Sequence, residues 1–131
     1  MSHARAILDT SVFIARERRR ELALDRFPDE GAISVVTLAE LGLGVHMARS
    51  GDERTARLRT LRTSEATYVA LPVDRAVAEE FAALVAAARR KGRRPKVQDA
   101  WIAATARAHG APVVTQDADF DGLPGVEVVR V

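Results

Sequence analysis

The stretch RAILDTSVFIA (residues 5–15) predicts the first strand of the chain and the helix that follows it. A short apolar run over residues 6–8 is typical of a buried strand, and the run ends on an acidic residue, Asp9. Two small hydroxyl residues, Thr10 and Ser11, come next, and a second apolar run then begins. Asp9 therefore stands where a carboxylate can either cap the following helix or form one wall of a metal site.

The composition is typical of a single globular domain. The chain has 131 residues, of which 47% are hydrophobic and 29% charged, and this suits one domain with one core. It contains no cysteine, which excludes a disulfide scaffold, a cysteine-based zinc site and a thiol nucleophile, and which fits a reducing cytoplasm. Its apolar runs are too short for a signal peptide or a membrane span, so we expect a cytoplasmic protein with no membrane attachment.

Strand-like and helix-like segments alternate along the chain. Strands are expected at residues 5–8, 32–36, 68–71, 112–115 and 126–131, and helices at 10–19, 37–51, 53–61, 74–90 and 96–109. Thr37 and Glu40 have the spacing of a capping box, which predicts a helix start at Thr37, and Gly51 is expected to end that helix. Asp74 is expected to cap the helix over 74–90. The alternation predicts an α/β fold with three layers, in which a central parallel sheet of four to five strands lies between helices.

Four carboxylates fall at the same edge of this predicted sheet. Asp9 ends the first strand, Glu40 and Asp99 lie in the first turns of two helices, and Asp117 directly follows the fourth strand. Strand C-termini and helix N-termini share one edge in such a fold, and open α/β sheets bind ligands there. Each carboxylate alone is explained by a cap or a turn. Together they would repel one another, and a divalent cation that prefers oxygen ligands, Mg²⁺ or Mn²⁺, removes that repulsion.

Basic residues are concentrated in two blocks. The block at 16–20 is explained equally well by a solvated helix face and by phosphate contact. The block RRKGRRPK at 89–96 is so densely cationic that contact with a polyanion is the better explanation. Because this block directly precedes Asp99, we expect Arg93, Arg94 and Lys96 to hold a polyanion backbone at the rim of the carboxylate site.

Three segments resemble the successive motifs of PIN-domain ribonucleases. They are ILDTSVFIA (7–15), TLAELGLG (37–44) and QDAWIAATARAHGAPVVTQDADF (98–120). The resemblance is greatest to the VapC-type toxins of bacterial toxin–antitoxin pairs and extends from residue 5 to about residue 130. It implies a single PIN-like domain over residues 1–131 that cleaves RNA internally with Mg²⁺ or Mn²⁺ and acts as a toxin. It also implies a homodimer, neutralised by a small cognate antitoxin of the VapB type.

By the same resemblance, the acidic quartet of the family falls on Asp9, Glu40, Asp99 and Asp117. Asp9, Asp99 and Asp117 are then expected to hold the metal, and Glu40 to position the attacking water. Many relatives carry Asn at the position of Asp117 and an acidic residue just before the phenylalanine. This chain has both Asp117 and Asp119, and Asp117 is favoured because it lies closer to the strand end.

Two other classes of protein fit parts of the sequence. A phosphatase of the haloacid-dehalogenase type with Asp9 as nucleophile would need a second aspartate two positions later, where this chain has Ser11. A non-catalytic RNA- or protein-binding module of the same fold would use the four carboxylates only as caps. The hydroxyls of Thr10, Ser11 and Thr115 could support the carboxylate site, but roles in turns and caps are favoured for all three.

Overall fold

The computed structural model describes residues 5–131, which form five strands, five α-helices and two short 3₁₀ helices. The strands are β1 (Arg5–Leu8), β2 (Glu30–Ser34), β3 (Val69–Leu71), β4 (Val113–Thr115) and β5 (Val128–Arg130). The helices are α1 (Thr10–Glu17), α2 (Val35–His46), α3 (Gly51–Thr67), α4 (Arg75–Arg90) and α5 (Val97–Ala108), with the 3₁₀ helices η1 (Leu24–Arg26) and η2 (Ala118–Phe120). Within this part of the chain, no helix is long and apolar enough to cross a membrane.

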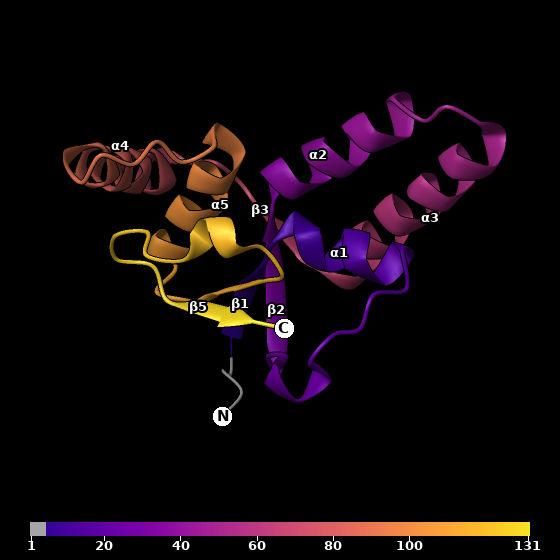
Figure 1. Ribbon diagram of the computed structural model, residues 1–131, viewed down its shortest axis with the longest axis horizontal. Helices are drawn as coiled ribbons and strands as arrows, with labels where there is room; N and C mark the ends of the chain where they lie inside the picture. The colour runs from indigo at the N-terminus through magenta and orange to yellow at the C-terminus, as the bar shows by residue number, and fades with distance from the viewer. Residues whose placement is uncertain (1–4) are drawn as a thin grey trace.

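The strands form one parallel sheet in the order β3-β2-β1-β4-β5. Helices α4 and α5 cover one face of the sheet, whereas α1 and α3 lie on the other side, with α2 packed along α3 (Figure 1). The predicted three-layer α/β arrangement, with a central parallel sheet of four to five strands, is confirmed.

Alternate residues of β1 supply two separate hydrophobic cores. Ile7 packs with Leu84 of α4 and Ile102 of α5, whereas Leu8 packs with Phe13 of α1. All five side chains are at most 4% exposed. Burying each one contributes about 1.5–3 kcal/mol, and the two-residue period of the strand directs successive side chains to opposite cores. The helices on both faces are therefore held against the same central strand.

Strand β1 lies at the point where the strand order reverses. The chain proceeds from β1 through β2 to β3 on one side and returns to β4 on the other side of β1. Leu8 of β1 is paired with Val114 of β4, so Asp9 and Thr115 follow at the same edge. Crevices that bind ligands form at such reversals, beyond the carboxyl ends of the strands.

Helix α2 begins earlier than its sequence predicted. The hydroxyl of Ser34, the last residue of β2, accepts a hydrogen bond from the N–H of Val36 at 3.1 Å and caps the helix. Thr37 lies inside the helix and is fully buried. The predicted capping box of Thr37 and Glu40 is therefore wrong, because Ser34 already satisfies the free N–H group at the helix start.

The glycine expected to end α2 instead begins α3. Helix α2 ends at His46, and the Oγ of Ser50 caps α3 by accepting the N–H of Glu53 at 3.1 Å. Gly51 is then the first residue of α3, so its predicted role was wrong. The predicted cap at Asp74 is confirmed, since its carboxylate accepts the N–H of Val77 at 3.0 Å.

Candidate active site

Asp9 caps α1 and lines a cavity at the edge of the sheet. Its carboxylate accepts the N–H of Ser11 at 3.3 Å and the hydroxyl of Thr115 at 2.9 Å. The residue is 3% exposed. Burial raises the pKa of the Asp9 carboxyl, and the hydrogen bonds from Ser11 and Thr115 oppose that rise. The helix cap is therefore present, and the same carboxylate is available to the cavity.

Glu40 reaches the same cavity from α2. It lies in the second turn of that helix, because the helix begins after Ser34, so the prediction of a first-turn position was wrong. Its Oε1 accepts the hydroxyl of Thr10 at 2.8 Å. Burial raises the pKa of Glu40, the hydrogen bond from Thr10 opposes the rise, and the negative charge of Asp9 adds to it.

Asp99 is the most perturbed carboxylate of the site. It lies in the first turn of α5, as expected, and is 8% exposed. Its Oδ2 is buried, and none of the residues 5–131 donates a hydrogen bond to it. Burial, followed by the negative charges of Asp9, Asp117 and Glu40, raises the pKa of Asp99 to about 7. Buried polar atoms rarely lack a partner, so this oxygen calls for a ligand that supplies positive charge.

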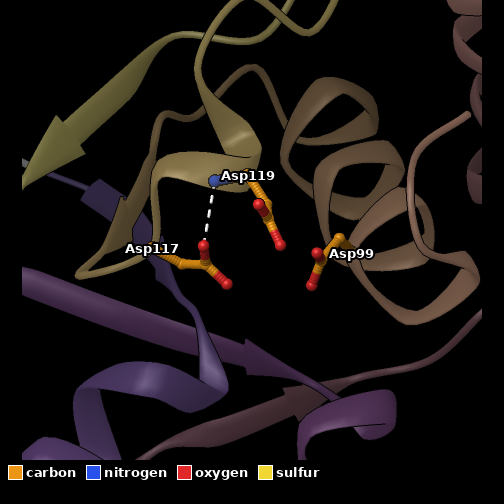
Figure 2. A group of neighbouring side chains, drawn as sticks. All are labelled: Asp99, Asp117 and Asp119. Carbon is orange, nitrogen blue, oxygen red and sulfur yellow. Dashed lines mark hydrogen bonds between the residues drawn. The ribbon is translucent and has the colours of Figure 1, made fainter. Parts of the chain in front are cut away.

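Asp117 and Asp119 both lie near Asp99, on the segment after β4. Figure 2 shows the three carboxylates, and one oxygen of each can lie within 4.8 Å of the others. Asp117 accepts the N–H of Asp119 at 2.9 Å, which caps η2. Asp119 also pairs with Lys96, whose Nζ lies 2.9 Å from its Oδ2. The two candidates thus differ in environment, since Asp119 forms an ion pair with Lys96, whereas Asp117 forms none with any of the residues 5–131.

One cavity brings the four predicted carboxylates together. It is lined by Asp9, Glu40, Asp99 and Asp117, and by Thr10, Ser11, Ile14, Lys96 and Gln98. Its walls come from the start of α1, from α2, from the start of α5 and from the segment after β4. The donor set consists of carboxylates and hydroxyls, with no sulfur or imidazole. This set fits a hard cation such as Mg²⁺ or Mn²⁺.

The basic residues before Asp99 have different partners. Arg93 donates to the carbonyl oxygens of Asp121 at 2.8 Å and Asp119 at 3.4 Å, so it supports η2. The hydrogen bond from Lys96 to Asp119, together with the nearby negative charges, raises the pKa of the Lys96 ammonium. Arg94 is exposed to solvent. Lys96 lines the cavity, whereas Arg93 is occupied by the loop that carries the acidic residues.

The loop after β4 is tied to distant parts of the chain through Gln116. Its N–H donates to the Oγ of Ser11 at 3.0 Å, and its carbonyl accepts from Arg130 at 2.9 Å. Its side-chain amide donates to the carbonyl oxygens of Glu21 at 3.0 Å and Val131 at 3.1 Å. The position of Asp117, one residue later, is therefore set by several fixed segments.

Hydroxyl side chains contact the carboxylates directly, which is the alternative that the sequence left open beside turns and caps. Thr115 bonds Asp9, Thr10 bonds Glu40, and the Oγ of Ser11 lies 3.0 Å from the Oγ1 of Thr115. The signal that points to them is position alone, since Thr115 ends β4, and Thr10 and Ser11 begin α1 directly after Asp9. Their expected roles in turns and caps are therefore incomplete.

Comparison with known proteins identifies the family. The chain matches the family model of the PIN domain over residues 6–126. It is 47% identical over 131 residues to Ribonuclease VapC5 of Mycobacterium tuberculosis, which covers 98% of this chain and 96% of that protein. It is 43% identical over 132 residues to Ribonuclease VapC4 of the same organism, with 100% of both chains covered. The chain therefore belongs to the PIN-domain family.

A solved structure agrees with the sequence comparison. The crystal structure of VapBC-5 from M. tuberculosis, a member of the VapBC family of toxin–antitoxin systems, has a TM-score of 0.88 to this chain at 44% identity. The match covers 98% of this chain and 99% of that one. Within the PIN-domain family the chain is thus of the VapC type, as its motifs indicated.

Proposed function

We propose that this chain is the ribonuclease toxin of a toxin–antitoxin pair, and that it hydrolyses RNA internally with a divalent cation held by Asp9, Asp99 and Asp117. Its relatives at 47% and 43% identity are named ribonucleases. Similarity of this degree over nearly the whole chain supports the same class of reaction here.

The observation that carries the metal site is the unpartnered Oδ2 of Asp99. This oxygen is buried among other carboxylates without a donor from residues 5–131. Repulsion between buried carboxylates lowers the stability of the fold unless a cation offsets it. Asp117 is the better third ligand, because it lines the same cavity as Asp9 and Asp99, whereas Asp119 is paired with Lys96.

The chemistry is hydrolysis of a phosphodiester bond. Mg²⁺ or Mn²⁺ bound by Asp9, Asp99 and Asp117 would polarise the phosphoryl group and offset the charge that develops on it. Glu40, which lines the same cavity, positions the attacking water and accepts a proton from it as the water oxygen bonds to phosphorus. The raised pKa of Glu40 suits this role, since a proton acceptor works best with a pKa closer to the ambient pH.

The leaving group is the O3′ of the preceding nucleotide. The P–O3′ bond breaks as the new P–O bond forms, and O3′ takes up a proton from solvent. The products are then a 5′-phosphate and a 3′-hydroxyl. Lys96 and Arg94 lie at the start of α5 and before it, where an RNA backbone that enters the cavity would meet their charges.

We also propose a protein partner, a cellular location and an oligomeric state. The match to a member of the VapBC family of toxin–antitoxin systems supports a small cognate antitoxin of the VapB type as partner. We place the reaction in the cytoplasm and the active protein in a homodimer. Light scattering of the purified protein, alone and with its antitoxin, tests the dimer and the complex.

The first experiment is 5′-end mapping of total bacterial RNA incubated with the purified protein and Mg²⁺ or Mn²⁺. Discrete new ends are expected, and they should vanish with EDTA and in the Asp99→Asn variant. Asp52→Asn is a matched control, because Asp52 is exposed in the first turn of α3 and lies outside the cavity. RNA binding without any new ends would instead support a non-catalytic binding module. Ends that persist in Asp99→Asn would refute the role of the carboxylate cluster.

A further inference from the structure

Two threonines next to Glu40 form a hydrogen-bonded pair that has no part in the reaction as described so far. Thr10 is the first residue of α1 and is 6% exposed, and Thr37 lies inside α2 and is 0% exposed. Their Oγ1 atoms lie 3.0 Å apart, and the Oγ1 of Thr10 lies 2.8 Å from the Oε1 of Glu40. The three side chains thus form a short chain that links two helices and ends at a carboxylate.

The number of hydroxyl protons decides which group donates in each of these hydrogen bonds. A hydroxyl group has one proton to donate and two lone pairs that can accept. The geometry gives Thr10 as the donor toward both Thr37 and Glu40, but its hydroxyl has a single proton. When Glu40 is ionised, that proton goes to the carboxylate, and the contact between the two threonines is then made with the proton of Thr37. Both protons therefore point toward Glu40.

The partner of Thr37 is unusual for a threonine within a helix. Thr105 of α5, which is also fully buried, donates to the carbonyl of Trp101 at 2.8 Å, four residues earlier in its own helix. Local bonds of this kind are the common choice for a helical threonine. Thr37 instead contacts a residue of another helix, far away in the sequence. Its hydroxyl therefore ties α2 to the start of α1 at the site.

A second chain of hydroxyls has the same direction. Thr115 donates its proton to the Oδ2 of Asp9, so the proton in its contact with Ser11 must come from Ser11. Ser11 and Thr115 in turn accept the N–H groups of Gln116 and Asp117. Two carboxylates that line the cavity, Asp9 and Glu40, are therefore each held by a pair of hydroxyls whose protons point at them.

We propose that Thr10 and Thr37 are positioning residues for Glu40. By binding Oε1 they hold the side chain in one orientation and leave Oε2 as the oxygen that serves the attacking water. Thr37 acts through Thr10 and does not touch the substrate. This inference rests on the proposed hydrolysis of RNA, in which Glu40 is the group that handles the water.

The test is the variant Thr37→Val, which keeps the shape of the side chain and removes its proton. Kinetics with a defined RNA and Mn²⁺ are expected to show a kcat lower by about 10- to 100-fold, as for other residues that orient the groups of a metal site, with KM unchanged. Thr37→Ser retains the hydroxyl and should restore kcat. Thr105→Val is the matched control, because it removes an equally buried hydroxyl that bonds only a carbonyl of its own helix.

A double variant separates positioning from general loss of structure. If Thr37 acts only through Glu40, then Thr37→Val should cause no further loss of kcat in a Glu40→Gln background. Losses that multiply, a Thr37→Val enzyme with unchanged kcat, or an equal loss in Thr105→Val would each overturn the proposal. A wild-type protein that cleaves no RNA with either metal would refute the proposed function instead.

One readout does not depend on cleavage. Buried hydrogen bonds slow the exchange of hydroxyl protons enough for NMR to detect them, so the hydroxyl proton of Thr10 should be visible in the wild-type protein. It should exchange faster in Thr37→Val and remain visible in Thr105→Val. Its absence from the wild-type spectrum, or its persistence unchanged in Thr37→Val, would overturn the directed chain even if no RNA is cut.

Discussion

The variant Asp99→Asn should be more stable than the wild-type protein at pH 8 when no metal is present. The pKa of Asp99 is raised from 3.8 to about 7, mainly by burial, so the fold favours its protonated form. A pKa raised in this way contributes stability that is fully present below the unfolded value near pH 4 and is lost as the pH rises through about 7. The metal-free wild-type protein should therefore lose stability between pH 4 and pH 8.

The size of the effect follows from the shift. About three pKa units correspond to roughly 4 kcal/mol at pH 8. The amide of asparagine at this position would be buried without a hydrogen-bond partner, which lowers the stability of the variant by about 1–3 kcal/mol. We expect a net gain of about 2 kcal/mol for Asp99→Asn at pH 8, which for a chain of this size raises the Tm by about 6–10 °C. At pH 4 Asp99 is uncharged in the folded protein, so only the cost of the buried amide remains, and the variant should melt about 6–10 °C below the wild-type protein.

Thermal unfolding followed by circular dichroism in EDTA, at pH 4 and pH 8, measures this difference. Asp52→Asn is the control, since Asp52 is exposed at the start of α3 and its loss should lower the Tm slightly at both values of pH. Added Mn²⁺ should raise the Tm of the wild-type protein and leave that of Asp99→Asn nearly unchanged. An Asp99→Asn variant that is no more stable than wild type at pH 8 in EDTA would refute the reasoning about charge repulsion at the site.

Three further outcomes are expected. Arg94→Gln combined with Lys96→Gln should weaken RNA binding for all sequences and lower the salt dependence of the affinity by about one unit of slope per charge removed. A filter-binding titration over KCl concentration measures this slope. An unchanged slope would contradict the contact with the RNA backbone. Arg93→Gln should destabilise the protein by about 0.5–1.5 kcal/mol in urea unfolding, because it removes exposed hydrogen bonds to two carbonyls of the η2 region. Leu84→Ala, which empties a fully buried position between α4 and α5, should cost about 2–5 kcal/mol in the same assay without changing the affinity for Mn²⁺.

The architecture was predictable because it depends on patterns that repeat along the chain. Apolar runs of strand length alternate with helical segments, and this alternation requires a parallel sheet with crossover helices. That topology places the ends of β1 and β4 and the start of α5 at one edge, whatever the exact boundaries are. The proximity of Asp9, Asp99 and Asp117 could therefore be predicted from their positions in the strands and helices.

Contacts between distant segments were not predictable in the same way. The Thr37–Glu40 spacing matches a capping box, but Ser34 at the end of β2 supplies the cap first, and the local pattern cannot reveal this competition. The hydroxyl of Thr37 then depends on how closely α1 approaches α2. Arg93 likewise binds carbonyls of the η2 region, because that region docks beside the segment before α5, and no local charge pattern indicates such a contact.

The central position of β1 in the sheet means that the site is completed late in translation. The strand is made well before its neighbour β4 and before the carboxylates of Asp99 and Asp117. At a translation rate of about 5–20 residues per second, roughly 5–20 s separate the synthesis of Asp9 from that of Asp117. A growing chain therefore has no complete cavity until Asp117 has been made and β4 has paired with β1.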